Sequence, residues 1–227
     1  MRCELRTILA AALFSFATLV SLAPPGIADS AATCALGETR NPTTTVFSFN
    51  EPQYSVFQLV RPSDCTSCTA GMAELKSATW RLRFFSSCTV TVEVSVVGAS
   101  DGPCPAPDTT AVLCPPAIVQ YTPSTTSSGQ NVVFPVSLAC CISQPAFVRL
   151  KMLDRGVCSS TDFIPFQIGL PAEECSTCRS YSLPPGQPLQ DSCVSPGVVP
   201  TISVQSDCCV PTPIESRSWG QLKTSYR

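Results

Sequence analysis

The sequence predicts an all-β protein: an antiparallel, jelly-roll-like β-sandwich that is rich in disulfides and ends in a short C-terminal helix. Three observations carry this prediction, namely short segments of alternating apolar and polar residues, 22 prolines, and 15 cysteines in 227 residues. Alternation places the apolar side chains on one face of a strand, which is typical of antiparallel sheets with one buried face. Because proline interrupts helices and central strands, the elements are expected to be short.

The clearest strands lie in the middle of the chain. Every second residue from Val90 to Val96 is valine, and the apolar residues of 80–84, beginning with Trp80, alternate with two arginines. The turn-forming residues 86–88 between them predict a hairpin, with Trp80 on its buried face. Weaker patterns of the same kind predict strands at 46–49, 54–60, 112–121, 132–138, 146–152, 163–168 and 201–204. Nine short strands indicate a sandwich, and this number favours a jelly roll over an immunoglobulin-like Greek key.

The N-terminal segment, residues 1–30, has the features of a secretory signal peptide. Arg2 and Arg6 precede an apolar run of 15 residues, 8–22, and a transmembrane helix needs about 20. Cleavage after Ala28 and cleavage after Ser30 both fit. We therefore expect a mature chain without a membrane span, secreted to the exterior or the cell surface, with the periplasm as the alternative.

The cysteines predict a disulfide framework. Removal of Cys3 with the signal peptide leaves 14, an even number in an exported chain, so we expect seven disulfides. The candidates are Cys34, Cys65, Cys68, Cys88, Cys104, Cys114, Cys140, Cys141, Cys158, Cys175, Cys178, Cys193, Cys208 and Cys209.

Spacing does not determine how the cysteines pair, but it suggests two local features. The adjacent cysteines of 140–141 and of 208–209 should each bond different partners, because neighbouring side chains of an extended chain point to opposite faces. Cys104 and Cys114 bracket a proline-containing loop that a local disulfide could close.

Two Cys-x-x-Cys motifs, 65–68 and 175–178, have three interpretations. They could form a thioredoxin-like redox site, although no βαβ pattern surrounds them, or supply four thiolates to zinc. Structural disulfides are the interpretation that export through an oxidising compartment favours. We therefore expect neither a metal nor a cofactor.

The chain contains no histidine, which removes Ser-His-Asp and Cys-His catalysis. Residues 98–102 match G-x-S-x-G, but Pro103 blocks the helix that a nucleophile elbow requires, so a glycine-rich turn is predicted. A pair of carboxylates could still hydrolyse glycosides, and Glu173-Glu174 is the one adjacent acidic pair. We predict no catalytic residue.

The formal net charge of −2 gives no basic surface for nucleic acid. We assign residues 31–172 to the sandwich, 173–213 to a Cys- and Pro-rich appendage packed on it, and 214–227 to a basic amphipathic tail. Ser218 can cap a short tail helix. The tail residues expected to be recognised by an export or cell-surface partner are Trp219, Leu222, Lys223, Tyr226 and Arg227. The alternative is a terminal helix that docks on its own sandwich or is simply frayed.

The ending Trp-Gly-x-Leu-Lys-x-x-Tyr-Arg, with the Cys-rich β segment before it, resembles a loosely defined group of secreted bacterial β-sandwich proteins. The resemblance implies a bacterial origin and no particular activity. We expect a non-enzymatic surface, matrix or binding module with a glycan or protein ligand. Tyr54, Tyr121 and Tyr181 are candidates for contact with a sugar. The alternative is a secreted carboxylate-based glycosidase or a Cys-x-x-Cys thiol oxidoreductase.

Overall fold

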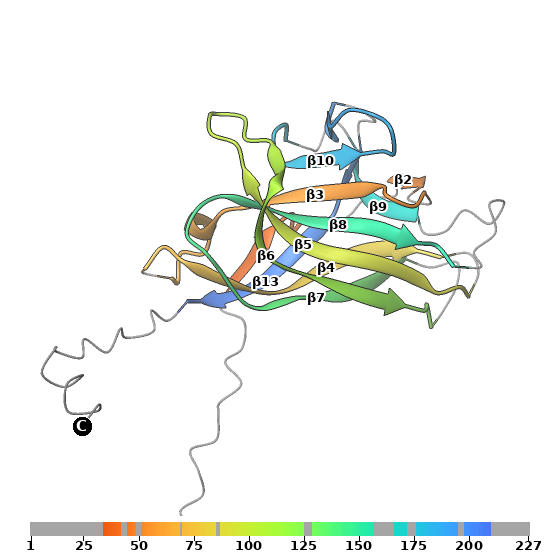
Figure 1. Ribbon diagram of the computed structural model, residues 1–227, viewed down its shortest axis with the longest axis horizontal. Helices are drawn as coiled ribbons and strands as arrows, with labels where there is room; N and C mark the ends of the chain where they lie inside the picture. The colour runs from red at the N-terminus through yellow and green to blue at the C-terminus, as the bar shows by residue number, and fades with distance from the viewer. Residues whose placement is uncertain are drawn as a thin grey trace, which may run out of the picture.

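The computed structural model describes residues 34–41, 45–48, 51–68, 70–84, 87–124, 129–156, 166–171, 176–194 and 198–209. The predicted signal peptide, the tail helix, Cys158, Cys175 and the Glu173-Glu174 pair lie outside these residues. The described chain forms two antiparallel sheets that face each other, as Figure 1 shows. The prediction of an all-β, disulfide-rich protein is therefore confirmed.

The first sheet, sheet A, has seven strands. Its main path runs in the order β1 (Cys34–Gly37), β13 (Ile202–Cys208), β4 (Ala73–Arg83), β9 (Phe166–Pro171) and β12 (Val198–Pro200). Strand β2 (Thr45–Ser48) pairs with β9, and β7 (Gly129–Ile142) pairs with β4 along most of its length.

The second sheet, sheet B, has six strands. Their order is β11 (Gln190–Asp191), β10 (Ser180–Leu183), β3 (Ser55–Val60), β8 (Ala146–Asp154), β5 (Val90–Ala99) and β6 (Pro107–Tyr121). A single turn of 3₁₀ helix, Pro62–Asp64, follows β3.

The main core lies between the sheets and consists of the apolar side chains that point inward from alternate positions of the strands. Trp80 and Leu82 on β4 meet valines of β5 such as Val92 and Val94 in one buried cluster. The Trp80 side chain is fully buried, as predicted, and its ring centroid lies 6.4 Å from that of Phe134. Burying a large aromatic side chain contributes roughly 1.5–3 kcal/mol.

A smaller cluster covers the opposite face of sheet B. Its members are Phe57, Leu59, Val97, Phe147 and Tyr181. All six residues of β3 are consequently buried, because its neighbours on each face exclude water. When both faces of a strand are buried, its apolar residues do not alternate with polar ones. The sequence pattern therefore did not reveal that sheet B has a second buried face.

The predicted hairpin of residues 80–96 is wrong. Strand β4 pairs with β7, β9 and β13 in sheet A, whereas β5 pairs with β6 and β8 in sheet B. Both strands direct their apolar side chains into the same core, but from opposite sheets. A turn signal indicates a change of direction, and it does not determine which sheet the next strand joins.

The predicted appendage, 173–213, is part of both sheets where the structure describes it. Strand β13 lies between β1 and β4, and β10 pairs with β3. The segment therefore contributes an interior strand, β13, as well as strands at the sheet edges, β11 and β12. Its prolines lie mostly between the strands, which left only the short alternation at 201–204 visible in the sequence.

Five disulfides join described cysteines: Cys34–Cys65, Cys68–Cys208, Cys104–Cys178, Cys114–Cys140 and Cys141–Cys209. Cys88 and Cys193 are disulfide-bonded as well, so each of the twelve cysteines in the described ranges is oxidised.

Two predictions about pairing have opposite outcomes. Each adjacent pair bonds two different partners, as predicted, because alternate side chains of β7 and β13 point to opposite faces. The prediction of a local Cys104–Cys114 disulfide is wrong. Cys104 reaches Cys178, next to β10, while Cys114 on β6 links to Cys140 on β7 and so joins the two sheets.

No helix among the described residues has the length and apolar character needed to cross a membrane.

Candidate functional site

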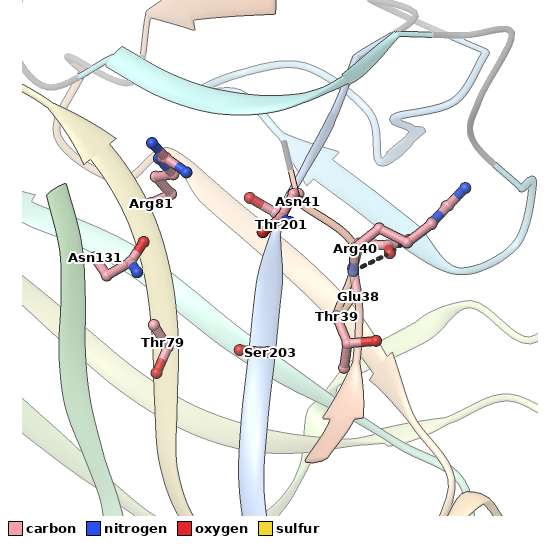
Figure 2. Close-up of a pocket in the computed structure, with 9 residues that line it drawn as sticks. All are labelled: Glu38, Thr39, Arg40, Asn41, Thr79, Arg81, Asn131, Thr201 and Ser203. Carbon is pink, nitrogen blue, oxygen red and sulfur yellow. Dashed lines mark hydrogen bonds and ion pairs between the residues drawn. The ribbon is translucent and has the colours of Figure 1, made fainter. Parts of the chain in front are cut away.

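A polar hollow on the outer face of sheet A is the candidate site, and we call it the Arg81 pocket. Nine residues line it: Glu38, Thr39, Arg40, Asn41, Thr79, Arg81, Asn131, Thr201 and Ser203. They come from β4, β7, β13, the segment that follows β1 and, for Thr201, the residue between β12 and β13, as Figure 2 shows.

Strand alternation positions the floor of the pocket. On β4, Trp80 and Leu82 point into the core, so Thr79 and Arg81 face outward. In the antiparallel register Arg81 is opposite Asn131 of β7, and Thr79 is opposite Ser203 of β13. Three adjacent strands therefore present polar side chains side by side.

Gly37 turns the chain over the end of β13 to form one wall. Its φ of +81° is in the region that favours glycine, and a Cβ atom there would lie 2.7 Å from the carbonyl oxygen of Ile202. The next amide, that of Glu38, donates a 2.9 Å hydrogen bond to the same oxygen. This contact holds the residues after Gly37 against the strand.

Glu38 and Arg40 form a closed ion pair in that wall. Arg40 Nε donates to Glu38 Oε1 at 2.8 Å, and an Nη2 donates to Oε2 at 2.7 Å. The Arg40 amide also donates to Oε1 at 3.1 Å. Glu38 is only 8% exposed, and its carboxylate has partners for both oxygens.

The pKa of Glu38 lies below its ordinary value of 4.5. Burial by itself raises this pKa, but it is outweighed by the hydrogen bonds from Arg40 and by the positive charges of Arg40 and Arg179. The carboxylate is therefore ionised at neutral pH.

Arg81 has no such partner. Its Nε is buried and makes no hydrogen bond, and no ion pair of Arg81 occurs among the described residues. Figure 2 shows Arg81 and Asn131 on one side of the pocket, with Glu38 and Arg40 on the other and Thr201 between them. The guanidinium is thus the uncompensated charge of the site.

The pocket suits a ligand with many hydroxyl groups. Threonine and serine hydroxyls donate and accept, the asparagine amides do both, and the guanidinium donates. Glycoside hydrolysis needs two carboxyl groups, and Glu38, the only acid among the described residues lining the pocket, is bound to Arg40. The described lining therefore offers a ligand hydrogen-bond donors and acceptors and one unpaired cation.

The tyrosines proposed for sugar contact lie elsewhere. Tyr54 and Tyr121 are half-buried, and Tyr181 is 6% exposed, with its hydroxyl donating to the Pro105 carbonyl at 3.0 Å. Burial raises the pKa of each of the three phenols. The residues predicted for tail recognition lie outside the described ranges.

The sulfurs of Cys34, Cys65 and Cys68 lie within 4.8 Å of one another. Cys34 is bonded to Cys65, and Cys68 is bonded to Cys208, so these sulfurs are disulfide sulfurs rather than thiolates. The two Cys-x-x-Cys motifs are also not joined to each other through Cys178, which bonds Cys104.

The G-x-S-x-G match is a turn, as predicted. Residues Gly98 and Ala99 end β5, and the Ser100 hydroxyl accepts a 2.9 Å hydrogen bond from the amide of Ala106. Ser100 therefore closes a loop rather than facing a catalytic base.

Sequence reasoning did not single out the Arg81 pocket. Arg81 on the polar phase of a predicted strand was the available signal, but exposed arginines are common on strands. Arg81 is informative because its guanidinium has no hydrogen-bond or ion-pair partner among the described residues. This becomes visible only when β4, β7 and β13 are seen side by side. No family model, no curated protein and no solved structure matches this chain.

Proposed function

We propose that the protein is a secreted, disulfide-stabilised, non-enzymatic module that binds an oligosaccharide in the Arg81 pocket. The observation that carries the proposal is the concentration of hydroxyl, amide and guanidinium groups on three adjacent strands. Such groups satisfy sugar hydroxyls, and a disulfide-linked sheet holds them in place without a large loss of entropy on binding. A binding site on strands is also more rigid than one on loops.

We also propose that the two sheets form a jelly roll. The strand order supports it: β1-β13-β4-β7 are neighbours in sheet A, and β3-β8-β5-β6 are neighbours in sheet B. If these eight strands are renumbered 1 to 8 along the chain, the order is 1-8-3-6 in sheet A and 2-7-4-5 in sheet B. This is the order of two interlocked Greek keys, and β2 and β9–β12 are additions to it. Jelly rolls include lectin domains, and this analogy of fold favours binding without assigning a ligand.

Secretion and attachment complete the proposal. Residues 1–30 act as the export signal, and the tail, 214–227, presents Trp219, Leu222, Lys223, Tyr226 and Arg227 to an export or cell-surface partner. The oxidised state of the twelve described cysteines supports a location outside the cytoplasm. Deletion of residues 216–227 is expected to preserve folding and to change the distribution between medium and cell surface; an unchanged distribution contradicts this role for the tail.

The competing class is a secreted enzyme. A thiol oxidoreductase needs a Cys-x-x-Cys dithiol, whereas Cys65 and Cys68 are bonded to different partners. A carboxylate-based glycosidase needs a second acid beside Glu38, and none lines the described pocket. Both observations favour a binding module.

A glycan array, followed by calorimetric titration of the best ligand, tests the proposal. We expect binding without release of sugar fragments, and we expect Asn131→Ala with Ser203→Ala to weaken it at least ten-fold. Gln120→Ala, an exposed polar residue on β6 in the other sheet, is the matched control and should have no effect. Glycan turnover favours the glycosidase, and an absence of any glycan binding overturns the proposal.

A further inference from the structure

We infer that the ligand of the Arg81 pocket is an acidic oligosaccharide whose carboxylate is bound by the guanidinium of Arg81. This inference rests on the proposed function and adds the charge of the ligand to it. Its basis is the unequal pairing of the three charged side chains that line the pocket.

The charged side chains that line the pocket do not balance one another. The pocket contains Glu38, Arg40 and Arg81. Glu38 and Arg40 neutralise each other through two side-chain hydrogen bonds, so Arg81 leaves a net charge of +1. A ligand with one negative charge compensates this site, and one with two charges, such as a phosphate monoester, overcompensates it.

Arg81 is only partly solvated. Its Nε is removed from water and has no acceptor in the described part of the protein. A buried polar group without a hydrogen bond is unfavourable, and more so when it carries charge. The Nε is as closed to a ligand as it is to water, so an oxyanion in the pocket would bind the terminal Nη donors and supply the countercharge that the guanidinium lacks. Part of the cost of burying this cation is thereby offset only in the complex.

The strands place further polar side chains beside Arg81. A guanidinium presents paired N–H donors in one plane, which match the two oxygens of a carboxylate. Asn131, opposite Arg81 in the register, is exposed and can donate its amide to the same group. Thr79 and Ser203 form the next outward pair, about 7 Å along the strands, which is comparable to the width of one sugar residue.

These positions define how a uronic acid residue would lie. Its carboxylate contacts Arg81 and Asn131, and hydroxyls on the far side of the same ring contact Thr79 and Ser203. No aromatic side chain is among the described residues that line the pocket. The sugar ring therefore has no aromatic ring to stack on, and the polar contacts alone set its orientation.

The experiment is a glycan array in which each uronic acid oligosaccharide is accompanied by its carboxyl-reduced form and by a sulfated neutral form of the same length. Calorimetric titration then measures the affinities of the best trio for the wild-type protein. We expect the carboxylated form to bind about ten- to a hundred-fold more tightly than the carboxyl-reduced form, as is usual for charge-assisted hydrogen bonds. The preference should decrease as salt is added.

Variants then assign the preference to Arg81. In Arg81→Gln the carboxylated and reduced forms should bind equally, and Arg81→Lys, which keeps the charge but loses the planar donor pair, should recover part of the difference. Lys76→Gln is the matched control, because it removes one positive charge from the same strand outside the pocket and should leave the preference intact. Equal thermal midpoints of the three variants exclude misfolding as the cause.

The outcomes separate the two claims. Equal binding of carboxylated and reduced sugars overturns the acidic ligand but leaves the proposed function standing. Preference for the sulfated form overturns the carboxylate assignment. A preference for the carboxylated form that survives Arg81→Gln overturns the role of Arg81, and failure of every sugar to bind overturns the proposed function itself.

Discussion

The sulfur of Cys65 lies 3.1 Å from the sulfur of Cys68, yet the two belong to different disulfides. Cys65 ties the turn after β3 to β1 through Cys34, and Cys68 ties the same turn to β13 through Cys208. The motif therefore joins a loop to two neighbouring strands of sheet A.

This arrangement predicts the product of peptide mapping. Proteolysis of the unreduced protein should yield cross-linked peptides for Cys34–Cys65 and Cys68–Cys208, detected by mass spectrometry. Alkylation before reduction should label none of the twelve described cysteines. A Cys65–Cys68 cross-link, or rapid labelling of either residue, contradicts the pairing and revives the oxidoreductase interpretation.

Removal of the Cys114–Cys140 disulfide should lower the free energy of unfolding by about 2–4 kcal/mol. The bond joins β6 to β7 across the two sheets and closes a loop with a sequence separation of 26. Chemical denaturation of Cys114→Ala with Cys140→Ala measures the loss. Because loop-closure entropy increases with length, removing Cys104–Cys178, with a separation of 74, should cost about 1 kcal/mol more. A smaller loss than for Cys114–Cys140 would contradict the entropic explanation.

Gly37→Ala should destabilise the protein by more than Gly71→Ala. Both glycines have positive φ, +81° and +64°, so each alanine incurs about 1–2 kcal/mol of backbone strain. Only at Gly37 does the new Cβ also approach another atom, the carbonyl oxygen of Ile202 at 2.7 Å, whereas nothing lies within 4 Å at Gly71. Urea denaturation compares them, and equal losses contradict the close approach. Gly37→Ala should in addition weaken sugar binding, because it displaces the wall that contains Glu38.

Tyr181→Phe should reduce stability by about 1 kcal/mol. The phenol hydroxyl donates to the Pro105 carbonyl at 3.0 Å, and the ring packs at 77° against Phe147 with centroids 5.6 Å apart. Phenylalanine preserves the ring contact and leaves the carbonyl without this donor. Thermal denaturation measures the difference. An unchanged midpoint for Tyr181→Phe contradicts the role of the hydrogen bond.

Glu38→Gln should change how stability depends on acid pH. Because the folded-state pKa of Glu38 is depressed below 4.5, its ionised form stabilises the fold above the unfolded-state pKa, and this contribution is lost as pH falls through the folded-state value. Wild type should therefore be more stable than Glu38→Gln near neutral pH. The difference should shrink as pH falls below about 4.5, as measured by denaturation at each pH. A difference that is constant across that range contradicts the assignment.

Local patterns predicted much of the fold. The alternation identified β5, β8 and the last four residues of β4, with their buried faces, because side-chain direction in a strand depends only on the parity of position. The same rule predicted that Cys140 and Cys141 would bond different partners. Strands such as β1 and β10 have four residues each, too few for a period to be recognised.

The sequence by itself determined the longer strand-forming segments, the oxidation of the described cysteines and the lack of a histidine-based catalytic site, because each depends on residue type or on near neighbours along the chain. Only the tertiary structure decided which sheet each strand joins, which cysteines pair and that Arg81 lies in a pocket without a partner. Those features depend on contacts between residues far apart in sequence, such as Arg81 with Asn131 and Thr79 with Ser203. The physical reason is that a strand specifies which side chains face outward, whereas the packing of the two sheets selects the strands beside it.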